Sequence, residues 1–65
     1  MKFLLEVDMA DEWTSEEAAR ELGRILRYWG GNLGHYALKP GDGAAVYASG
    51  HQEAGRWRIV AADGT

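Results

Sequence analysis

The chain has 65 residues, of which 46% are hydrophobic, and it contains no cysteine. Disulfide bonds and thiolate metal sites are therefore excluded, and so short a chain forms one domain, 1–65, that buries only about 60% of its unfolded surface. The formal net charge of −3 argues against a dedicated nucleic-acid binder, because such proteins are usually basic. Small cores without disulfides or metal usually need oligomerisation, so we expect a homodimer.

The sequence carries no pattern for membrane insertion or export. The apolar run before Glu6 is only three residues long, too short for the core of a signal peptide, and no apolar run approaches the roughly 18 residues of a membrane span. The absence of cysteine fits a reducing compartment. These observations predict a cytoplasmic protein with no membrane partner.

Residues 2–9 alternate between apolar and polar side chains, which predicts a half-buried strand. The face turned to the core carries Phe3, Leu5, Val7 and Met9. Leu4 is an apolar residue on the other face. The acidic stretch that follows lacks the ligand spacing and central glycine of a calcium loop, so no metal site is predicted at Asp8, Asp11, Glu12 and Glu16.

Residues 14–29 predict the main helix. Thr14 can act as the N-cap and Glu17 can complete a capping box, while Gly30 or Gly31 can supply a left-handed residue that ends the helix. At about 100° per residue, an apolar arc forms on one side. It consists of Ala18, Leu22, Ile25, Leu26 and Trp29.

The opposite side of this helix carries Arg20, Arg24 and Arg27, with Tyr28 on the flank. Glu16 stands four residues before Arg20, the favourable order for an ion pair on a helix surface. Two interpretations stay open for the arginines. They form either a solvated face or a surface that meets a partner.

The second half of the chain predicts further strands. Residues 30–34 form an irregular segment with Leu33 tucked under it, residues 35–39 alternate as a strand, and residues 40–43 (PGDG) form a turn. Residues 44–49 would return as the second strand of a hairpin, with Val46 facing the core and Tyr47 facing outward. Residues 50–55 form a loop, residues 56–61 alternate as the last strand, and residues 62–65 form a frayed tail.

The predicted fold is α+β: one amphipathic helix on one face of a three- to four-stranded, mainly antiparallel sheet, in the order β-α-β-β or β-α-β-β-β. The predicted core is Phe3, Leu5, Val7, Leu22, Ile25, Leu26, Trp29, Leu33, Leu38, Val46, Trp57 and Ile59. The reverse face of the sheet would carry Leu4, Tyr47, Val60 and part of Tyr36, framed by Lys2, Lys39, Arg56 and Arg58. That face is either merely solvated or a binding surface.

An enzyme is not predicted. The candidate catalytic groups are His35, His51, Ser49 and Tyr47, with Asp42 or Glu53 as orienting acids, but no nucleophile-elbow or oxyanion-hole signature surrounds them. The GGNLG segment lacks the lysine and hydroxyl of a phosphate-binding loop and follows a helix instead of opening one. No cofactor is therefore expected.

The stretch from Arg24 to Gly43, RILRYWGGNLGHYALKPGDG, resembles a set of short uncharacterised proteins of high-GC actinobacteria and their phages. The shared features include the KFLLEVD opening, the ILRYW helix end, the PGDG-type turn and the closing GRW strand, in the same order. The resemblance implies an intracellular bacterial or phage setting, and it brings no activity or residue role.

These observations predict a small intracellular protein–protein interaction module, a phage-type inhibitor or regulator that binds a bacterial protein. The alternative is a nucleic-acid-binding protein that uses the helix arginines and the sheet-face aromatics. The residues predicted to contact the partner are Arg20, Arg24, Arg27, Tyr28, Leu4, Tyr47, Arg56 and Arg58.

Overall fold

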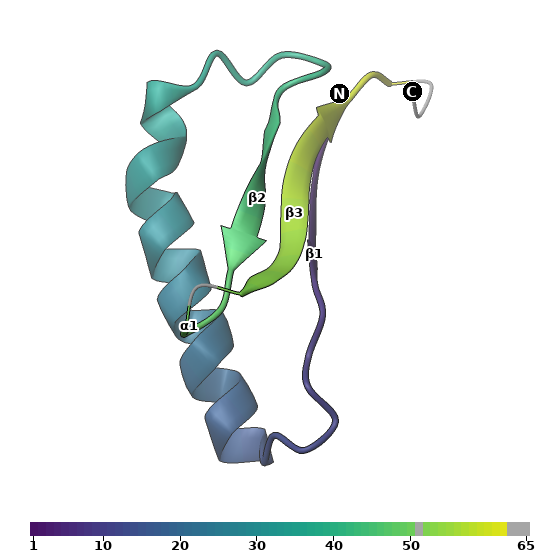
Figure 1. Ribbon diagram of the computed structural model, residues 1–65. Helices are drawn as coiled ribbons and strands as arrows, with labels where there is room; N and C mark the ends of the chain where they lie inside the picture. The colour runs from purple at the N-terminus through teal and green to yellow at the C-terminus, as the bar shows by residue number, and fades with distance from the viewer. Residues whose placement is uncertain (51, 63–65) are drawn as a thin grey trace.

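The computed structural model describes residues 1–50 and 52–62, and it confirms the predicted α+β fold. The elements are β1 (Lys2–Val7), α1 (Ser15–Asn32), a short 3-10 helix η1 (Leu33–His35), β2 (Gly43–Tyr47) and β3 (Glu53–Val60). The three strands form one antiparallel sheet in the order β1-β3-β2, with the last strand in the middle. The helix runs along one side of this sheet (Figure 1).

The start of α1 confirms the predicted capping box. The Thr14 hydroxyl accepts from the Glu17 N–H at 3.1 Å, and the Glu17 carboxylate accepts from the Thr14 N–H at 2.9 Å. These two bonds satisfy amide groups that the first turn of a helix leaves without partners inside the helix. Thr14 therefore fixes where the helix begins.

The end of α1 does not match the prediction. The helix runs through Gly30 and Gly31, and the left-handed glycines of the described chain are Gly41 and Gly50 instead. Asn32 donates its side-chain amide to the Tyr28 carbonyl at 2.6 Å, and the Leu33 N–H bonds to the Trp29 carbonyl. Because these bonds satisfy carbonyls of the last turn, the helix needs no left-handed residue there.

The core lies between α1 and the strands β2 and β3. Ile25 and Trp29 of the helix pack with Val46, Trp57 and Ile59 of the sheet. Trp57 is fully buried, and its ring meets those of Phe3, Trp29 and Tyr36 at centroid distances of 5.7, 5.5 and 5.0 Å. Leu5, Val7, Leu33, Leu38 and Ala44 are partly buried against this cluster. Most of the predicted core is therefore confirmed.

Leu26 and Phe3 depart from the predicted core, and Met9 departs from the predicted core-facing side of the first strand. They are 55%, 45% and 51% exposed. The buried side of α1 is centred on Ile25 and Trp29, and their sheet partners lie on β2 and β3. Leu26 projects about 100° away from Ile25 around the helix axis, and Phe3 and Met9 belong to β1 and the segment after it. The β1 flank of the helix-bearing face is consequently only partly covered.

The strand predicted for residues 35–39 is absent from the described chain. Leu33–His35 forms a 3-10 turn, and Leu38 adopts a positive φ of 56°, which a strand does not allow. The Tyr36 ring packs on Trp29 and Trp57, so it lies on the helix side of the sheet. The prediction that part of Tyr36 lies on the reverse face is therefore wrong. Packing of Tyr36 on the two tryptophans and of Leu38 on the core cluster outweighs their short alternation.

The predicted turn at residues 40–43 is confirmed. The Asp42 N–H bonds to the Lys39 carbonyl at 2.9 Å, with Pro40 and Gly41 in the corner positions and Gly41 at φ 100°. These are the features of a type II turn, which favours glycine at its third position. Because no strand precedes it, this turn leads from the end of the helix into β2 and does not join a hairpin.

The middle strand β3 is longer than predicted and begins at Glu53. A bulge shifts its register with β2, so that Val46 lies opposite Gly55 and Tyr47 opposite Glu53. A Cβ atom at Gly55 would collide with the Glu6 carbonyl of β1. Glycine is therefore required where β3 approaches β1 this closely.

The reverse face of the sheet carries the second set of side chains. The register places Leu4 opposite Arg58 and Glu6 opposite Arg56. Among the described residues, no helix or strand covers this face (Figure 1). Val60 was predicted to be exposed there, but it is 8% exposed, because Lys2 pairs with it on one side and the 39–42 turn lies on the other.

Candidate functional site: an aromatic groove beside the edge of β2

The eight residues predicted to contact a partner lie on three separate surfaces. Arg24, Tyr28 and Tyr47 meet beside the edge of β2. Leu4, Arg56 and Arg58 lie on the reverse face of the sheet. Arg20 and Arg27 lie exposed on the outer side of α1. The structure thus brings three of the eight residues together around one concave feature.

That feature, called the α1–β2 groove below, has a volume of about 530 Å³. The helix supplies one wall with Arg24, Ile25, Tyr28 and Trp29. The strand supplies the other wall with Ala44, Ala45 and Tyr47, and Tyr36 completes the lining. Tyr28 is 57% exposed and Tyr36 is 38% exposed, so aromatic surface is open to a ligand.

One side of the groove is the edge of β2. Among the described residues, β2 has a hydrogen-bonded strand neighbour on one side only, because β3 lies between β2 and β1. Asp42 and Ala48 bond through their backbones to Ile59 and Gln52 of the β3 side. In an antiparallel pair these contacts fall on alternate residues, so the N–H and C=O groups of Gly43, Ala45 and Tyr47 point away from β3, out of the free edge of β2.

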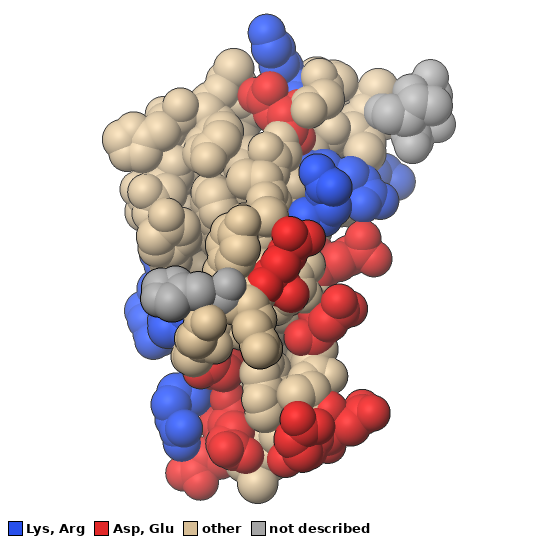
Figure 2. Space-filling model, in the orientation of Figure 1, with Lys and Arg blue, Asp and Glu red and all other residues tan. Residues whose placement is uncertain are grey.

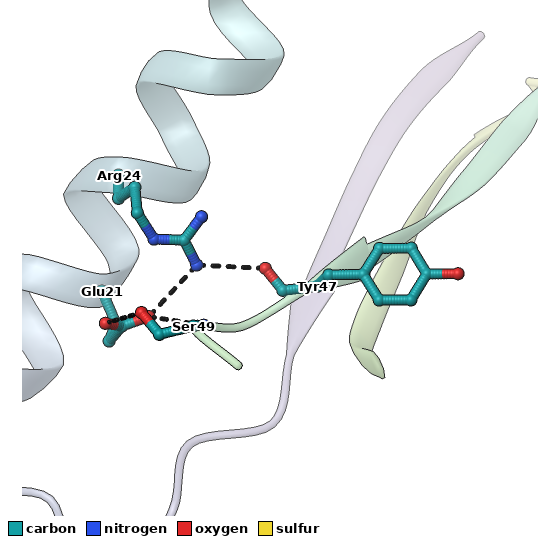
Figure 3. Close-up of polar contacts among 4 residues, drawn as sticks. All are labelled: Glu21, Arg24, Tyr47 and Ser49. Atoms are coloured by element: carbon teal, nitrogen blue, oxygen red, sulfur yellow. Dashed lines mark hydrogen bonds and ion pairs between the residues drawn. The ribbon is translucent and has the colours of Figure 1, made fainter. Parts of the chain in front are cut away.

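A polar cluster of Glu21, Arg24, Tyr47 and Ser49 closes one end of the groove (Figure 3). The Arg24 Nη2 donates to the Tyr47 carbonyl and to the Glu21 carboxylate, each at 3.1 Å. Ser49 donates to Glu21 through its hydroxyl at 2.6 Å and its N–H at 3.2 Å. The Tyr47 ring points away from Arg24, while its carbonyl faces the helix (Figure 3). The cluster ties the end of β2 to the middle of α1.

The hydrogen bonds of this cluster change the acidity of Glu21. The bond from the Ser49 hydroxyl, followed by those from Arg24 and the Ser49 N–H, stabilises the carboxylate and lowers the pKa of Glu21 below its ordinary value. Glu21 is therefore ionised at neutral pH and holds Arg24 by charge as well as by hydrogen bonding.

The reverse face offers a different arrangement. The Arg58 Nη1 donates to the Glu6 carboxylate at 3.2 Å, and both side chains are well exposed. An exposed pair of this kind contributes roughly 0–1 kcal/mol. A second, smaller hollow of about 380 Å³ lies along Arg56, Arg58 and the 41–43 segment. Its lining is more polar in character than that of the α1–β2 groove.

Acidic and basic side chains are distributed differently over the surface. Figure 2 shows acidic groups around the end of the molecule where the β1–α1 connection lies, and basic groups in several separate places. Uncharged side chains cover the C-terminal part of α1 and the neighbouring β2 in this view (Figure 2). The basic side chains visible in this view do not line up as one basic strip (Figure 2).

The candidate catalytic groups are dispersed. The Ser49 hydroxyl is bound to Glu21, and Asp42 accepts from the Lys39 N–H within its turn at 3.3 Å. His35 ends the 3-10 helix, and His51 lies outside the described residues. Within residues 1–50 and 52–62, no three His, Asp or Glu side chains come together in a way that could hold a metal ion. Over the same residues, no helix combines the length and apolar character of a membrane span.

Several groove residues were not predicted to be functional. Tyr36 was assigned to the reverse face, Trp29 to the core alone, and Ala44 and Ala45 to a weak strand. The absence of charge and proline from GAAVY was the available signal, because it marks a strand whose edge other chains can approach. Glu21 and Ser49 gave no signal, since their contact spans 28 residues of sequence.

No protein-family model, curated protein or solved structure matches this chain.

Proposed function

We propose that the protein is a small interaction module that acts by occupying a site on a bacterial protein, as a phage-type inhibitor or regulator in the cytoplasm. The α1–β2 groove would be its contact surface. The observation that carries the proposal is one largely apolar hollow that Arg24, Tyr28 and Tyr47 line together. Aromatic residues and arginine are enriched at the centres of protein interfaces, where charged residues in general are depleted.

The roles of the groove residues follow from their exposure. The exposed rings of Tyr28 and Tyr36 would anchor the partner, because they can bury large apolar area on contact. Arg24 would steer the encounter and orient the partner, since charge complementarity acts mainly on association rate and specificity. The bacterial target is suggested by the resemblance to short actinobacterial and phage proteins.

The positions of the arginines favour a protein partner over nucleic acid. A nucleic-acid surface usually presents arginine and lysine together along one face. Here the arginines of the prediction lie on three separate surfaces, with Arg24 at the groove, Arg56 and Arg58 on the reverse face, and Arg20 and Arg27 on the outer side of α1. The net charge of −3 adds to this argument.

A capture experiment tests the proposal. The wild-type chain, Tyr28→Ala and Arg24→Glu would each be immobilised and exposed to an actinobacterial lysate treated with nuclease. The matched control is Arg20→Glu, which makes the same charge change on the outer side of α1. We expect wild type and Arg20→Glu to retain the same protein, and Tyr28→Ala and Arg24→Glu to retain at least tenfold less.

Two results would contradict the proposal. One is equal retention by all four chains, which would place the contact elsewhere. The other is no retained protein together with binding to nucleic acid that weakens steeply as salt is added, the behaviour of a phosphate-binding surface.

The homodimer is a separate part of the proposal. It is motivated by the short chain and by the exposed apolar side chains of Phe3, Met9 and Leu26. Sedimentation equilibrium of the wild-type chain between micromolar and millimolar concentration measures it directly. A single species of 7.2 kDa across that range would rule out the dimer.

A further inference from the structure

We infer that the α1–β2 groove takes an extended peptide segment of the partner, which adds to β2 as a fourth strand of the sheet. Bulky apolar side chains of that segment enter the groove, and a carboxylate near the Tyr47 end meets Arg24. This inference rests on the proposed function and names the kind of partner that the same surface fits. Four observations carry it.

The first observation is the backbone of β2. The N–H and C=O groups of Gly43, Ala45 and Tyr47 point away from β3, and the Tyr47 carbonyl shows this directly by accepting from Arg24. An added strand bonds to such groups at every second residue. Arg24 holds the Tyr47 carbonyl, which leaves Gly43 and Ala45 as the main sites of new hydrogen bonds.

The second observation is the contrast between the two edge strands. Natural edge strands are commonly protected against pairing by charged side chains, proline or bulges. The edge strand β1 carries the charged residues Lys2 and Glu6. By contrast β2, with the sequence GAAVY, carries no charge and no proline. The bulge in its pairing with β3 places the extra residue on β3, so β2 itself is not bulged. The edge of β2 is therefore the one suited to pairing.

The third observation is the hollow beside that edge. Alternate side chains of a strand point to the same face and repeat about every 7 Å, so an added strand would direct every second side chain at the groove. The groove of about 530 Å³ has room for large side chains, and the rings of Tyr28, Trp29 and Tyr36 form its apolar surface. The remaining side chains of the segment would face the reverse side of the sheet.

The fourth observation is charge. Arg24 is the charged member of the groove lining. Its Nη2 is engaged by Glu21 and Tyr47, but among the described residues its Nε and Nη1 hydrogens have no acceptor, and its side chain is 43% exposed. A guanidinium with donors to spare favours a carboxylate. The segment is accordingly apolar with an acidic residue.

A second copy of this chain fits the groove less well. In a symmetric pairing of two β2 strands, the side chains directed at each groove would be Ala44 and Val46 of the other copy. Val46 is 1% exposed because it is buried in its own core, and Ala44 is small. Self-pairing would therefore leave the groove largely unfilled, whereas a foreign segment can bring larger side chains.

The test uses a displayed library of random octapeptides, selected on the immobilised full-length chain. We expect the enriched peptides to alternate bulky apolar residues with other residues and to carry an acid. Ala45→Pro removes an N–H that points out of the free edge of β2 while leaving the bonds between β2 and β3 in place, so it should weaken binding at least tenfold. The matched control is Ser15→Pro at the first position of α1, where proline is tolerated.

Two further measurements do not depend on the folding of Ala45→Pro. Amide hydrogen exchange of the wild-type chain should slow at least tenfold at Gly43 and Ala45 when an enriched peptide is added. Selection on Arg24→Glu should change the enriched charge from acidic to basic, while selection on Arg20→Glu should leave it acidic.

The contradicting results are distinct from those of the lysate capture. Enriched peptides that leave the Gly43 and Ala45 amides exchanging at their original rate would overturn strand addition, although capture through Tyr28 and Arg24 would still support the proposed function. A library that yields no enriched peptide would also overturn it. Protection of the same amides that grows with protein concentration, without peptide, would assign the edge to a second copy instead.

Discussion

Arg24 on the helix donates a hydrogen bond to the backbone carbonyl of Tyr47 at the end of β2, across 3.1 Å. The contact joins residues 23 positions apart and sets the spacing between α1 and the strand edge at that end of the groove. The Glu21 carboxylate accepts hydrogen bonds from both Arg24 and Ser49. The groove is therefore shaped by a polar cluster at its end and by aromatic packing along its wall.

The Glu21 carboxylate should make stability depend on acid. Its pKa in the folded chain is lowered by Ser49 and Arg24, so its contribution is fully present above the pKa of an unfolded glutamate, about 4.3, and is lost as the pH falls through the lower folded value. We expect Glu21→Gln to be less stable than wild type at pH 7, and the difference to shrink as the pH drops below about 4. Urea denaturation of both chains at pH 7 and pH 3 measures this. A difference that is unchanged between the two pH values would contradict it.

The Thr14 cap should stabilise the whole domain, since α1 forms one side of the core. Thr14→Ala removes the hydroxyl that accepts from Glu17 and should cost about 1 kcal/mol in the free energy of unfolding. Ser15→Ala, one residue further on, is the control and should change stability by less than about 0.5 kcal/mol. Thermal or urea denaturation followed by circular dichroism compares the two. Equal effects would show that the capping box does not set the helix start.

Two neighbouring helix residues should respond differently to truncation. Ile25 is 2% exposed and packs on the sheet, so Ile25→Ala should cost about 2–5 kcal/mol. Leu26 is 55% exposed, and Leu26→Ala should cost less than about 1 kcal/mol. Urea denaturation of the two variants decides the point. A larger loss for Leu26 would mean that α1 is rotated about its axis relative to this structure, or that Leu26 is buried by a second copy.

Gly55 should not tolerate a side chain. A Cβ atom there would collide with the backbone of Glu6, so Gly55→Ala should force β1 and β3 apart and cost about 1–3 kcal/mol. Gly34→Ala is the control, because a Cβ atom at Gly34 meets open space. Denaturation midpoints of the two variants should therefore separate clearly. A Gly55→Ala chain as stable as wild type would contradict the close crossing of the strands.

Local signals predicted the start of the helix and the elements that carry strong patterns. The capping box at Thr14, the turn at Pro40–Gly41 and the strand alternation around Trp57 all act within a few residues, so the sequence alone was sufficient for them. The helix end was mispredicted because Gly30 and Gly31 suggest a stop that the Asn32 side chain makes unnecessary. Local signals of this kind compete, and the sequence does not show which of them prevails.

The candidate site could be predicted only in part. The exposed flank of α1 predicted Arg24 and Tyr28, since a helical period places them away from the apolar arc. The strand order β1-β3-β2 could not be predicted, because it depends on which strands pair over long separations in the chain. That order makes β2 an edge, and it also brings Tyr36 and Tyr47 to the groove. The prediction assigned the remaining arginines to the same partner surface because of their charge, whereas the fold places them on separate surfaces.

Photo-crosslinking tests most directly whether the α1–β2 groove is the contact surface. A benzophenone-bearing phenylalanine derivative would be placed at position 28 in the groove, at position 20 on the outer side of α1, and at position 56 on the reverse face, each in the full chain expressed in an actinobacterial host. Irradiation should attach a bacterial protein to the chain labelled at position 28 and not to the other two. Crosslinks from position 20 or 56, with none from position 28, would contradict the account.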